Sequence, residues 1–227
     1  MSGGRPEGVF FDLDGTLVDT APDFHAGVNR LRERQGLEPL PYDVIRAVVS
    51  EGARAVIAAG FPQLAAGDPL QETLRQTFLD EYQIHLADHS RLFPGLDAVL
   101  ADIERRGLAW GVVTNKPSRY TDPLMTALGL DRRSAATVCP DQVSRSKPDP
   151  EPLFKAAALA GVNPARCIYV GDHVRDIEAG RRAGMLTVAV GWGYVQPGDA
   201  PADWGADVLC ERVEDFAGWL GRHLGQC

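Results

Sequence analysis

Short apolar runs rich in β-branched residues recur along the chain, and stretches with helical spacing of their apolar positions separate most of them. The strand-like runs cover residues 8–12, 108–114, 136–139, 167–171, 186–190 and 206–209. The run at 167–170 is continuously apolar, which is typical of a strand buried on both faces of a parallel sheet. Helical patterns at 154–160 and 177–183 alternate with these runs. The pattern predicts an α/β protein with a Rossmann-like, doubly wound parallel sheet.

The alternation of strands and helices is interrupted once, between residues 18 and 93. No convincing strand occurs there, and three helical patterns cover residues 24–35, 42–59 and 70–85, with proline-containing breaks between them. The sequence therefore predicts a helical domain (18–93) inserted into a core domain (1–17 and 94–227). Because the insert directly follows the first strand, we expect it to act as a lid. The alternative is a helical subdomain that only adds to the core.

The composition is that of an ordinary globular protein, and it argues against some classes of partner. The chain has 227 residues, 44% hydrophobic and 24% charged, and is long enough to bury a proper core. Its net charge of −8, without a basic stripe, argues against a nucleic-acid partner. No apolar run approaches the roughly 18 residues of a membrane span, and the polar residues 1–7 lack the apolar segment of a signal peptide. We therefore expect no membrane partner and a cytoplasmic location.

The cysteines and the last long loop indicate no chemistry of their own. Four cysteines lie far apart, without C-x-x-C spacing: Cys139, Cys167, Cys210 and Cys227. This spacing argues against a zinc site or a disulfide framework and fits a reducing compartment. A loop rich in Gly, Pro and Asp covers residues 193–204, and we expect nearby aromatic side chains to anchor it to the core: Trp192, Tyr194 and Trp204.

The first strand-like run leads into the motif Asp12-Leu13-Asp14-Gly15-Thr16. If the strand ran straight through both carboxylates, Asp12 and Asp14 would share one face, because strand side chains alternate. Two like charges that close repel each other unless a cation lies between them. The motif therefore favours a hard divalent cation together with nucleophilic and acid–base chemistry. The alternative is a strand that ends in an Asx-type turn.

Three further segments carry polar groups at or near the ends of predicted strands. Thr114 and Asn115 end the second strand, Lys147 lies in a proline-stiffened loop, and Asp172 and Asp176 follow the fourth strand. The carboxyl ends of parallel strands meet at one crevice, where ligands bind. Hydroxyl, backbone N–H and ammonium groups suit an anion, and a third carboxylate suits Mg²⁺. Taken singly, Asn115 and Asp172 could instead be helix N-caps, and Lys147 and Asp176 solvated charges.

In their order and placement, these four motifs resemble those of the haloacid dehalogenase-like phosphatase superfamily, across residues 9–209. The helical insert is similar to the small α-helical cap of that family. The resemblance implies that Asp12 is the nucleophile and forms an aspartyl-phosphate. It implies that Asp14 protonates the leaving alkoxide and then helps to activate the hydrolytic water.

The same resemblance implies the remaining site. Thr114, the backbone around Asn115, and Lys147 would bind or neutralise the phosphoryl group. Mg²⁺ would be held by Asp12, the backbone carbonyl of Asp14, and Asp172. Asp176 would support these ligands. One departure from the family pattern is His173, where a smaller polar residue is expected.

The segment 12–23 is typical of the phosphoglycolate phosphatase-like branch of this family. Within it, segments such as 48–55, 110–117 and 146–153 imply hydrolysis of N-acetylmuramic acid 6-phosphate in peptidoglycan recycling. The alternatives are phosphoglycolate or another small sugar phosphate. A sugar-phosphate mutase would need a cap group that helps to return the phosphoryl group, and a dehalogenase would have little use for Asp14. The retained catalytic groups argue against a non-catalytic phospho-ligand sensor.

Selection of the leaving group must come from outside the phosphate-binding motifs. Gly52 breaks a helical pattern at residues 50–54, which would let the backbone approach a ligand. N-acetylmuramic acid 6-phosphate carries a lactyl carboxylate, and an arginine can bind a carboxylate through two hydrogen bonds. We therefore predict that Arg54 binds this carboxylate. The alternative is a solvated helix residue.

Overall fold

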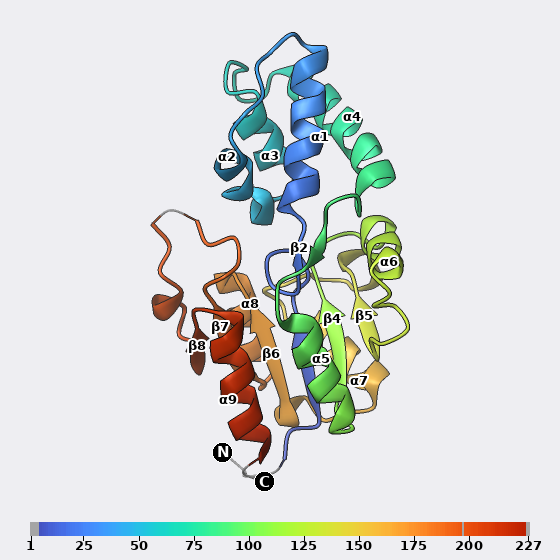
Figure 1. The fold of residues 1–227 in the computed structure, drawn as a ribbon, viewed down its shortest axis with the longest axis vertical. Helices are drawn as coiled ribbons and strands as arrows, with labels where there is room; N and C mark the ends of the chain where they lie inside the picture. The colour runs from blue at the N-terminus through green and yellow to red at the C-terminus, as the bar shows by residue number, and fades with distance from the viewer. Residues whose placement is uncertain (1–4, 197, 226–227) are drawn as a thin grey trace.

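A six-stranded parallel sheet forms the centre of the structure, a computed structural model that describes residues 5–196 and 198–225 (Figure 1). Residues 1–4, which begin the polar amino-terminal segment, and Cys227 lie outside the described residues. The strands are β1 (Gly8–Phe11), β4 (Ala109–Val113), β5 (Ala136–Val138), β6 (Cys167–Gly171), β7 (Leu186–Val190) and β8 (Val208–Cys210). Their order is β5-β4-β1-β6-β7-β8. This is the doubly wound order, with its switch point between β1 and β6, and the predicted fold class is confirmed.

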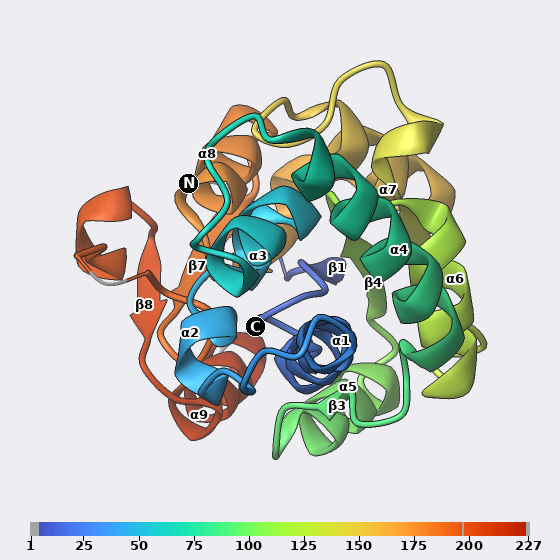
Figure 2. The ribbon, with the colours of Figure 1, turned by 90° about the horizontal axis from the view of Figure 1, so that it is seen from above.

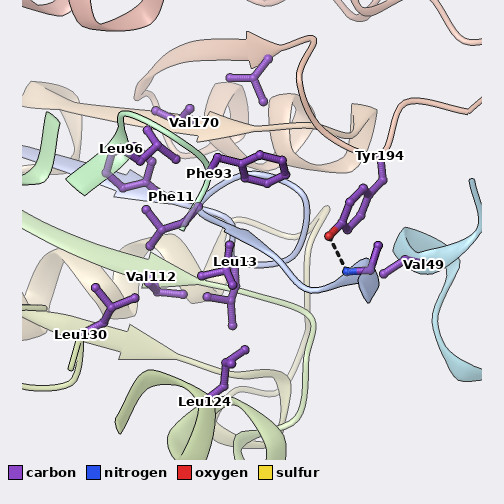
Figure 3. Packing of buried hydrophobic residues seen from close by; sticks show 14 of the residues in the cluster. Phe11, Leu13, Val49, Phe93, Leu96, Val112, Leu124, Leu130, Val170 and Tyr194 are labelled. Atoms are coloured by element: carbon purple, nitrogen blue, oxygen red, sulfur yellow. Dashed lines mark hydrogen bonds between the residues drawn. The ribbon is translucent and has the colours of Figure 1, made fainter. Parts of the chain in front are cut away.

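Helices cover both faces of the sheet. They are α5 (Leu96–Arg105), α6 (Ser118–Ala127), α7 (Glu151–Ala160), α8 (Val174–Arg182) and α9 (Val213–Gly225). Along β1 the side chains alternate: Phe11 packs edge-on against Phe216 of α9, and Phe10 packs in the other cluster, with residues of α7 and α8. All four residues of β1 are buried, as expected of a central strand with helices on both faces. Figure 3 shows Phe11 in the larger cluster, among residues of β4 and β6.

The insert lies over the carboxyl edge of the sheet, where the loop after β1 emerges (Figures 1 and 2). Its helices are α1 (Ala21–Arg34), α2 (Tyr42–Arg46), α3 (Ala53–Gly60) and α4 (Pro69–His85). The helical pattern over 42–59 is divided at the break that Gly52 indicates, because the short 3₁₀ helix η1 (Val49–Glu51) separates α2 from α3. At that break Gly52 adopts a φ of +82°, which is left-handed backbone that favours glycine.

The entry and exit of the insert are tied together. Val18–Asp19 (β2) pairs antiparallel with Arg91–Leu92 (β3), where the sequence predicts no strand. Strands of two residues are too short to produce a recognisable alternation of apolar and polar positions. The buried carboxylate of Asp23 accepts three hydrogen bonds from His89 N, Ser90 N and Ser90 Oγ at 2.6–2.9 Å. The two ends of the insert are thus held to each other where the insert joins the core.

Aromatic side chains anchor the loop after β7, Trp192 and Trp204 to the core as predicted, and Tyr194 to the start of the insert. The Tyr194 hydroxyl accepts hydrogen bonds from the N–H groups of Thr20 and Ala21 at the start of α1 and donates to Asp19. Figure 3 shows the Tyr194 hydroxyl with a hydrogen bond from a nitrogen atom. Trp192 Nε1 donates to Thr16 O at 3.0 Å, and the Trp204 ring stacks on His173. The loop then passes through the 3₁₀ helix η4 (Pro201–Trp204) to β8; two others are η2 (Pro140–Gln142) and η3 (Pro164–Arg166).

The buried cysteines carry free thiols. Cys139, Cys167 and Cys210 are each unpaired, and burial raises the pKa of all three thiols, to about 11, 12 and 11. Buried free cysteines of this kind act as small apolar groups. Within residues 5–196 and 198–225, no helix has the length and apolar character needed to cross a membrane.

Candidate active site

The carboxylate of Asp12 is buried at the carboxyl end of the central strand. β1 ends at Phe11, and the Asp12 N–H still donates to Val170 O of β6 at 2.9 Å. Asp12 Oδ1 accepts the Leu13 N–H and lies 2.9 Å from Lys147 Nζ. Because the strand ends before the motif, the straight strand through both carboxylates does not form, and Asp14 lies in the turn that follows. Because of the turn, the carboxylates of Asp12 and Asp14 do not share one face of a strand.

Lys147 provides a fixed ammonium beside Asp12. Its side chain is 0% exposed, and Nζ donates to Asp176 Oδ1 (2.7 Å), Val113 O (2.9 Å) and Tyr169 Oη (2.9 Å). The Asn115 amide accepts from the backbone N–H of Lys147 and donates to its backbone carbonyl, at 3.2 and 3.0 Å. Lys147 is thus fixed at both ends, and the interpretation of it as a solvated charge is wrong.

Asp172 is enclosed by two glycines. Its Oδ1 accepts the Thr16 hydroxyl and its Oδ2 the Tyr194 N–H, both at 2.8 Å. A Cβ on Gly15 would lie 2.2 Å from Asp172 Oδ2, and one on Gly193 would lie 2.3 Å from Asp172 Cβ. Gly15 also adopts a φ of +84°. Any side chain at either glycine would therefore collide with this carboxylate.

Three buried carboxylates share a small space with one ammonium. Asp12, Asp172 and Asp176 each offer an oxygen, and these oxygens lie within 4.8 Å of one another. Burial, and then repulsion by the other two carboxylates, raises the pKa of Asp172 to about 7. Burial also raises the pKa of Asp176, against the attraction of Lys147. Burial would lower the pKa of Lys147, but Asp12 and Asp176 outweigh it and raise the pKa. The three carboxylates carry more negative charge than the single ammonium of Lys147 neutralises, and they offer only oxygen atoms as ligands. Both features fit a divalent cation.

The Asp14 carboxylate makes contacts that the sequence does not predict. Its Oδ1 accepts the Thr20 hydroxyl at 2.6 Å and lies 2.9 Å from Lys116 Nζ. Lys116 Nζ also donates to the Tyr82 hydroxyl of α4 at 2.8 Å. Lys116 directly follows the Thr114-Asn115 motif, and this position is the one sequence signal that could have pointed to it. Tyr82 lies 34 residues before Lys116 and has no such signal.

The helix-cap interpretations of Asn115 and Asp172 are wrong. Helix α6 begins at Ser118, whose N–H donates to Asp141 Oδ1 rather than to Asn115. The N-cap of α8 is His173, the residue that departs from the family pattern. Thr114 is buried, and its hydroxyl accepts the Lys116 N–H at 3.0 Å. Asn115 and Asp172 therefore do not cap these helices, and their side chains can take part in the site.

His173 connects the core to the insert. Its Nδ1 accepts the Arg175 N–H, and its Nε2 lies 3.2 Å from Glu51 Oε1 in η1. Arg175 Nη2 donates to Ser50 O in the same 3₁₀ helix at 2.8 Å. The imidazole therefore caps α8 and reaches the insert as well, which a smaller polar residue could not do.

A cavity of about 260 Å³ lies between the core and the insert and reaches Asp12 and Asp14. From the core it is lined by Asp12, Asp14, Thr114, Asn115, Lys116, Pro117, Arg119, Tyr120 and Arg175. From the insert it is lined by Phe24, Val49, Ser50, Gly52, Ala53, Arg75, Leu79 and Tyr82. The insert thus contributes a largely apolar wall opposite the polar strand ends.

Arg54 is not brought to this cavity. Its side chain is exposed and lines a separate hollow with Asp68 and Glu72. Arg75 lines both spaces but is paired with Glu72. Arg119 lines the cavity from the core, and its guanidinium lies over the Tyr120 ring, 4.5 Å from the centroid. The predicted contact of Arg54 with substrate therefore has no support in this arrangement, because α3 directs the side chain outward.

The fold, the four strand-end motifs and the helical insert together define the class of this protein. The chain belongs to the haloacid dehalogenase-like hydrolase family, whose profile matches residues 9–190, and it is a phosphoric monoester hydrolase. It is 51% identical to the N-acetylmuramic acid 6-phosphate phosphatase of Pseudomonas aeruginosa over 223 residues, 98% of each chain.

Other relatives carry a different substrate in their names. The chain is 42% identical to a phosphoglycolate phosphatase of Xanthomonas campestris over 207 residues, 91% of this chain and 93% of the relative. The crystal structure of a predicted phosphoglycolate phosphatase from Haemophilus somnus superposes with a TM-score of 0.81 at 26% identity. The match covers 96% of this chain and 98% of that one. The resemblance inferred from the motifs is therefore confirmed at the level of family and branch.

Proposed function

We propose that this chain hydrolyses N-acetylmuramic acid 6-phosphate in the cytoplasm, through an aspartyl-phosphate on Asp12. The observation that carries the proposal is the cavity, which has Asp12 and Asp14 at one end and apolar side chains of the insert at the other. The substrate's N-acetyl and lactyl groups bring methyl groups that suit this wall. Phosphoglycolate, a two-carbon acid, would leave the wall without an apolar partner. The nearly full-length relative in Pseudomonas aeruginosa supports the same substrate.

The proposed reaction has two steps. First, an Asp12 carboxylate oxygen attacks phosphorus, the bond from phosphorus to the sugar oxygen breaks, and the departing oxygen takes a proton from Asp14. Second, water attacks phosphorus, its proton passes to Asp14, and phosphate leaves Asp12. Lys147 neutralises negative charge on Asp12 and on the transferred group, and Thr114 and the backbone at Asn115 bind its oxygens. The helices of residues 18–93 act as a cap that limits the access of water.

We infer that Mg²⁺ is the cation of this site. Asp12, Asp172 and the backbone carbonyl of Asp14 would hold it. Asp176 is engaged with Lys147 and with the His173 N–H, so it supports the ligands. When bound, Mg²⁺ supplies positive charge beside the phosphoryl oxygens and the buried carboxylates. Chelation should therefore abolish turnover.

Mg²⁺ should stabilise the protein more at pH 8 than at pH 5. The pKa of Asp172 is raised from 3.8 to about 7, so between these values the folded protein binds a proton that the unfolded chain does not. The stability that this protonation contributes is lost as the pH rises towards 7. Mg²⁺ must displace the proton at pH 5 but not at pH 8. Melting temperatures in EDTA and in Mg²⁺ at both pH values measure the effect.

The matched control is Asp172→Asn, which removes the titrating carboxylate and should abolish the pH-dependent part of the Mg²⁺ response. A Mg²⁺-induced shift of equal size at both pH values in the unsubstituted protein would show that Asp172 does not take up the ion.

The substrate proposal is tested by comparing kcat/KM for N-acetylmuramic acid 6-phosphate and phosphoglycolate. We expect the amino-sugar phosphate to be hydrolysed far better. Arg119 lines the cavity, and we expect it to bind the lactyl carboxylate of this substrate. Arg119→Ala should therefore lower kcat/KM for N-acetylmuramic acid 6-phosphate by about 10- to 100-fold, the effect of losing a charge-assisted hydrogen bond of about 1.5–3 kcal/mol. Arg54→Ala is the matched control and should cost less than about threefold, because its side chain lies outside the cavity.

A larger loss in Arg54→Ala than in Arg119→Ala would restore the sequence-based prediction for Arg54. A preference for phosphoglycolate would contradict the proposed substrate and would favour the activity named for the phosphoglycolate phosphatase relatives.

A further inference from the structure

We propose that Lys116 is a positioning residue for the acid–base carboxylate of Asp14, and that Phe24 and Tyr82 of the insert hold Lys116 in this role. The inference rests on the proposed phosphomonoesterase function and adds to it a residue that none of the four motifs assigns. The chain has three lysines, and two of them, Lys116 and Lys147, contact the two catalytic carboxylates.

The two contacts of Asp14 fall on the same oxygen. Oδ1 accepts the Thr20 hydroxyl at 2.6 Å and lies 2.9 Å from Lys116 Nζ. Within the described part of the chain, Oδ2 has no hydrogen-bond partner. A carboxylate held through one oxygen by two donors cannot rotate freely, and it presents the other oxygen in a constant direction. Oδ2 is therefore the oxygen that can give its proton to the leaving group.

The insert surrounds Lys116 with aromatic rings. Its Nζ lies 5.0 Å from the ring centroid of Phe24 in α1 and 4.8 Å from that of Tyr82 in α4, and it donates to the Tyr82 hydroxyl. The side chain is 5% exposed. A desolvated ammonium is attracted to the face of an aromatic ring such as Phe24 and is held at the edge of Tyr82 by the hydrogen bond to its hydroxyl. Lys116 comes from the core, and both rings come from the insert.

Thr20, the second donor to Asp14, also belongs to the insert, at the start of α1. Its backbone N–H donates to the Tyr194 hydroxyl, which fixes the first turn of the helix. The orientation of Asp14 therefore depends on the insert through Thr20 directly and through Lys116 indirectly. The acid–base group is set correctly only while α1 and α4 lie over the core.

This role predicts a specific dependence on the leaving group. When the bond from phosphorus to a sugar oxygen breaks, the electron pair moves to that oxygen, which needs the Asp14 proton. A 4-nitrophenolate leaving group is stable without that proton. Loss of the correct Asp14 orientation should therefore slow the first step for the sugar ester and spare it for the aryl ester. This difference appears in kcat/KM, which reports the reaction up to departure of the leaving group, whereas the second step is common to both esters and enters kcat.

The experiment measures kcat and KM of Lys116→Met for N-acetylmuramic acid 6-phosphate and for 4-nitrophenyl phosphate, both with Mg²⁺. We expect kcat/KM for the sugar ester to fall about 100-fold and kcat/KM for the aryl ester to fall less than about fivefold. Asp14→Asn should show the same difference between the two esters. Lys155→Met removes the third lysine, on α7, and should show no such difference.

A second variant tests the hydrogen bond from Lys116 to Tyr82 without removing the ammonium. Tyr82→Phe keeps the ring and removes the hydroxyl that accepts from Lys116, so it should lower kcat/KM for the sugar ester alone, by about 3- to 10-fold. This variant keeps the proposal testable if Lys116→Met does not fold, which thermal denaturation would reveal.

Equal losses of kcat/KM on both esters in Lys116→Met, or an unchanged kcat/KM for the sugar ester, would overturn the positioning role, provided that Asp14→Asn shows the difference. Failure of the unsubstituted protein on both esters would instead overturn the proposed function. A missing difference in Asp14→Asn would overturn the role of Asp14 on which this inference depends.

Discussion

Asp12→Asn is expected to lower turnover by at least about 1,000-fold, because a carboxamide is a poor nucleophile and a poor ligand for a divalent cation. The amide is nearly isosteric with the carboxylate, and its oxygen can still accept the Leu13 N–H and contact Lys147. It also removes one of three crowded negative charges. The melting temperature should therefore stay the same or rise. Phosphate release and thermal denaturation measure the two effects.

The control for Asp12→Asn is Asp122→Asn, the same chemical change at an exposed residue of α6. It should leave both activity and melting temperature unchanged. Activity of Asp12→Asn within tenfold of the unsubstituted protein would rule out Asp12 as the nucleophile.

Lys147→Met is expected to damage both activity and stability. The substitution leaves Asp12 and Asp176 buried without the ammonium that contacts both. Removal of one partner from a buried ion pair costs about 3–5 kcal/mol, which for a chain of this size corresponds to a fall of roughly 10 °C in the melting temperature. Turnover should fall by at least about 100-fold, because the charge on the phosphoryl group is no longer neutralised.

A double variant separates these two effects. Lys147→Met combined with Asp176→Asn removes the charges of both Lys147 and Asp176. The double variant should therefore be more stable than Lys147→Met alone but equally inactive. If Lys147→Met kept both its melting temperature and its activity, the ammonium would have no role in either.

The core of the fold could be predicted because its strands are buried on both faces. Continuous apolar runs such as 167–170 and the motifs directly after them leave few alternatives for the sheet. The insert was less well predicted. Gly52 indicates a break in the helical pattern over 42–59 but not the 3₁₀ helix η1 that forms there, and β2 and β3 are too short to produce a periodic pattern. These features depend on packing between segments far apart in the chain.

The candidate site was also predictable where it depends on local motifs, and not where it depends on contacts between distant segments. Asp12, Lys147 and Asp172 each lie in a local motif, and the structure brings all three to one place. The contacts of Lys116 could not be predicted, because its aromatic partner Tyr82 belongs to a helix of the insert and has no motif around it. For Arg54 the reverse holds: a suitable residue type in a suitable segment points away from the cavity, since helix phase decides the direction of its side chain.

The central claim, that Asp12 carries the phosphoryl group, is tested most directly by trapping the intermediate. The protein is mixed with N-acetylmuramic acid 6-phosphate and Mg²⁺, quenched during turnover and reduced with borohydride, which converts an aspartyl-phosphate into homoserine. Peptide mass spectrometry should find this conversion at residue 12, only when substrate is present, and not in Asp12→Asn. Steady turnover with residue 12 unmodified, or conversion of a different carboxylate, would contradict the account.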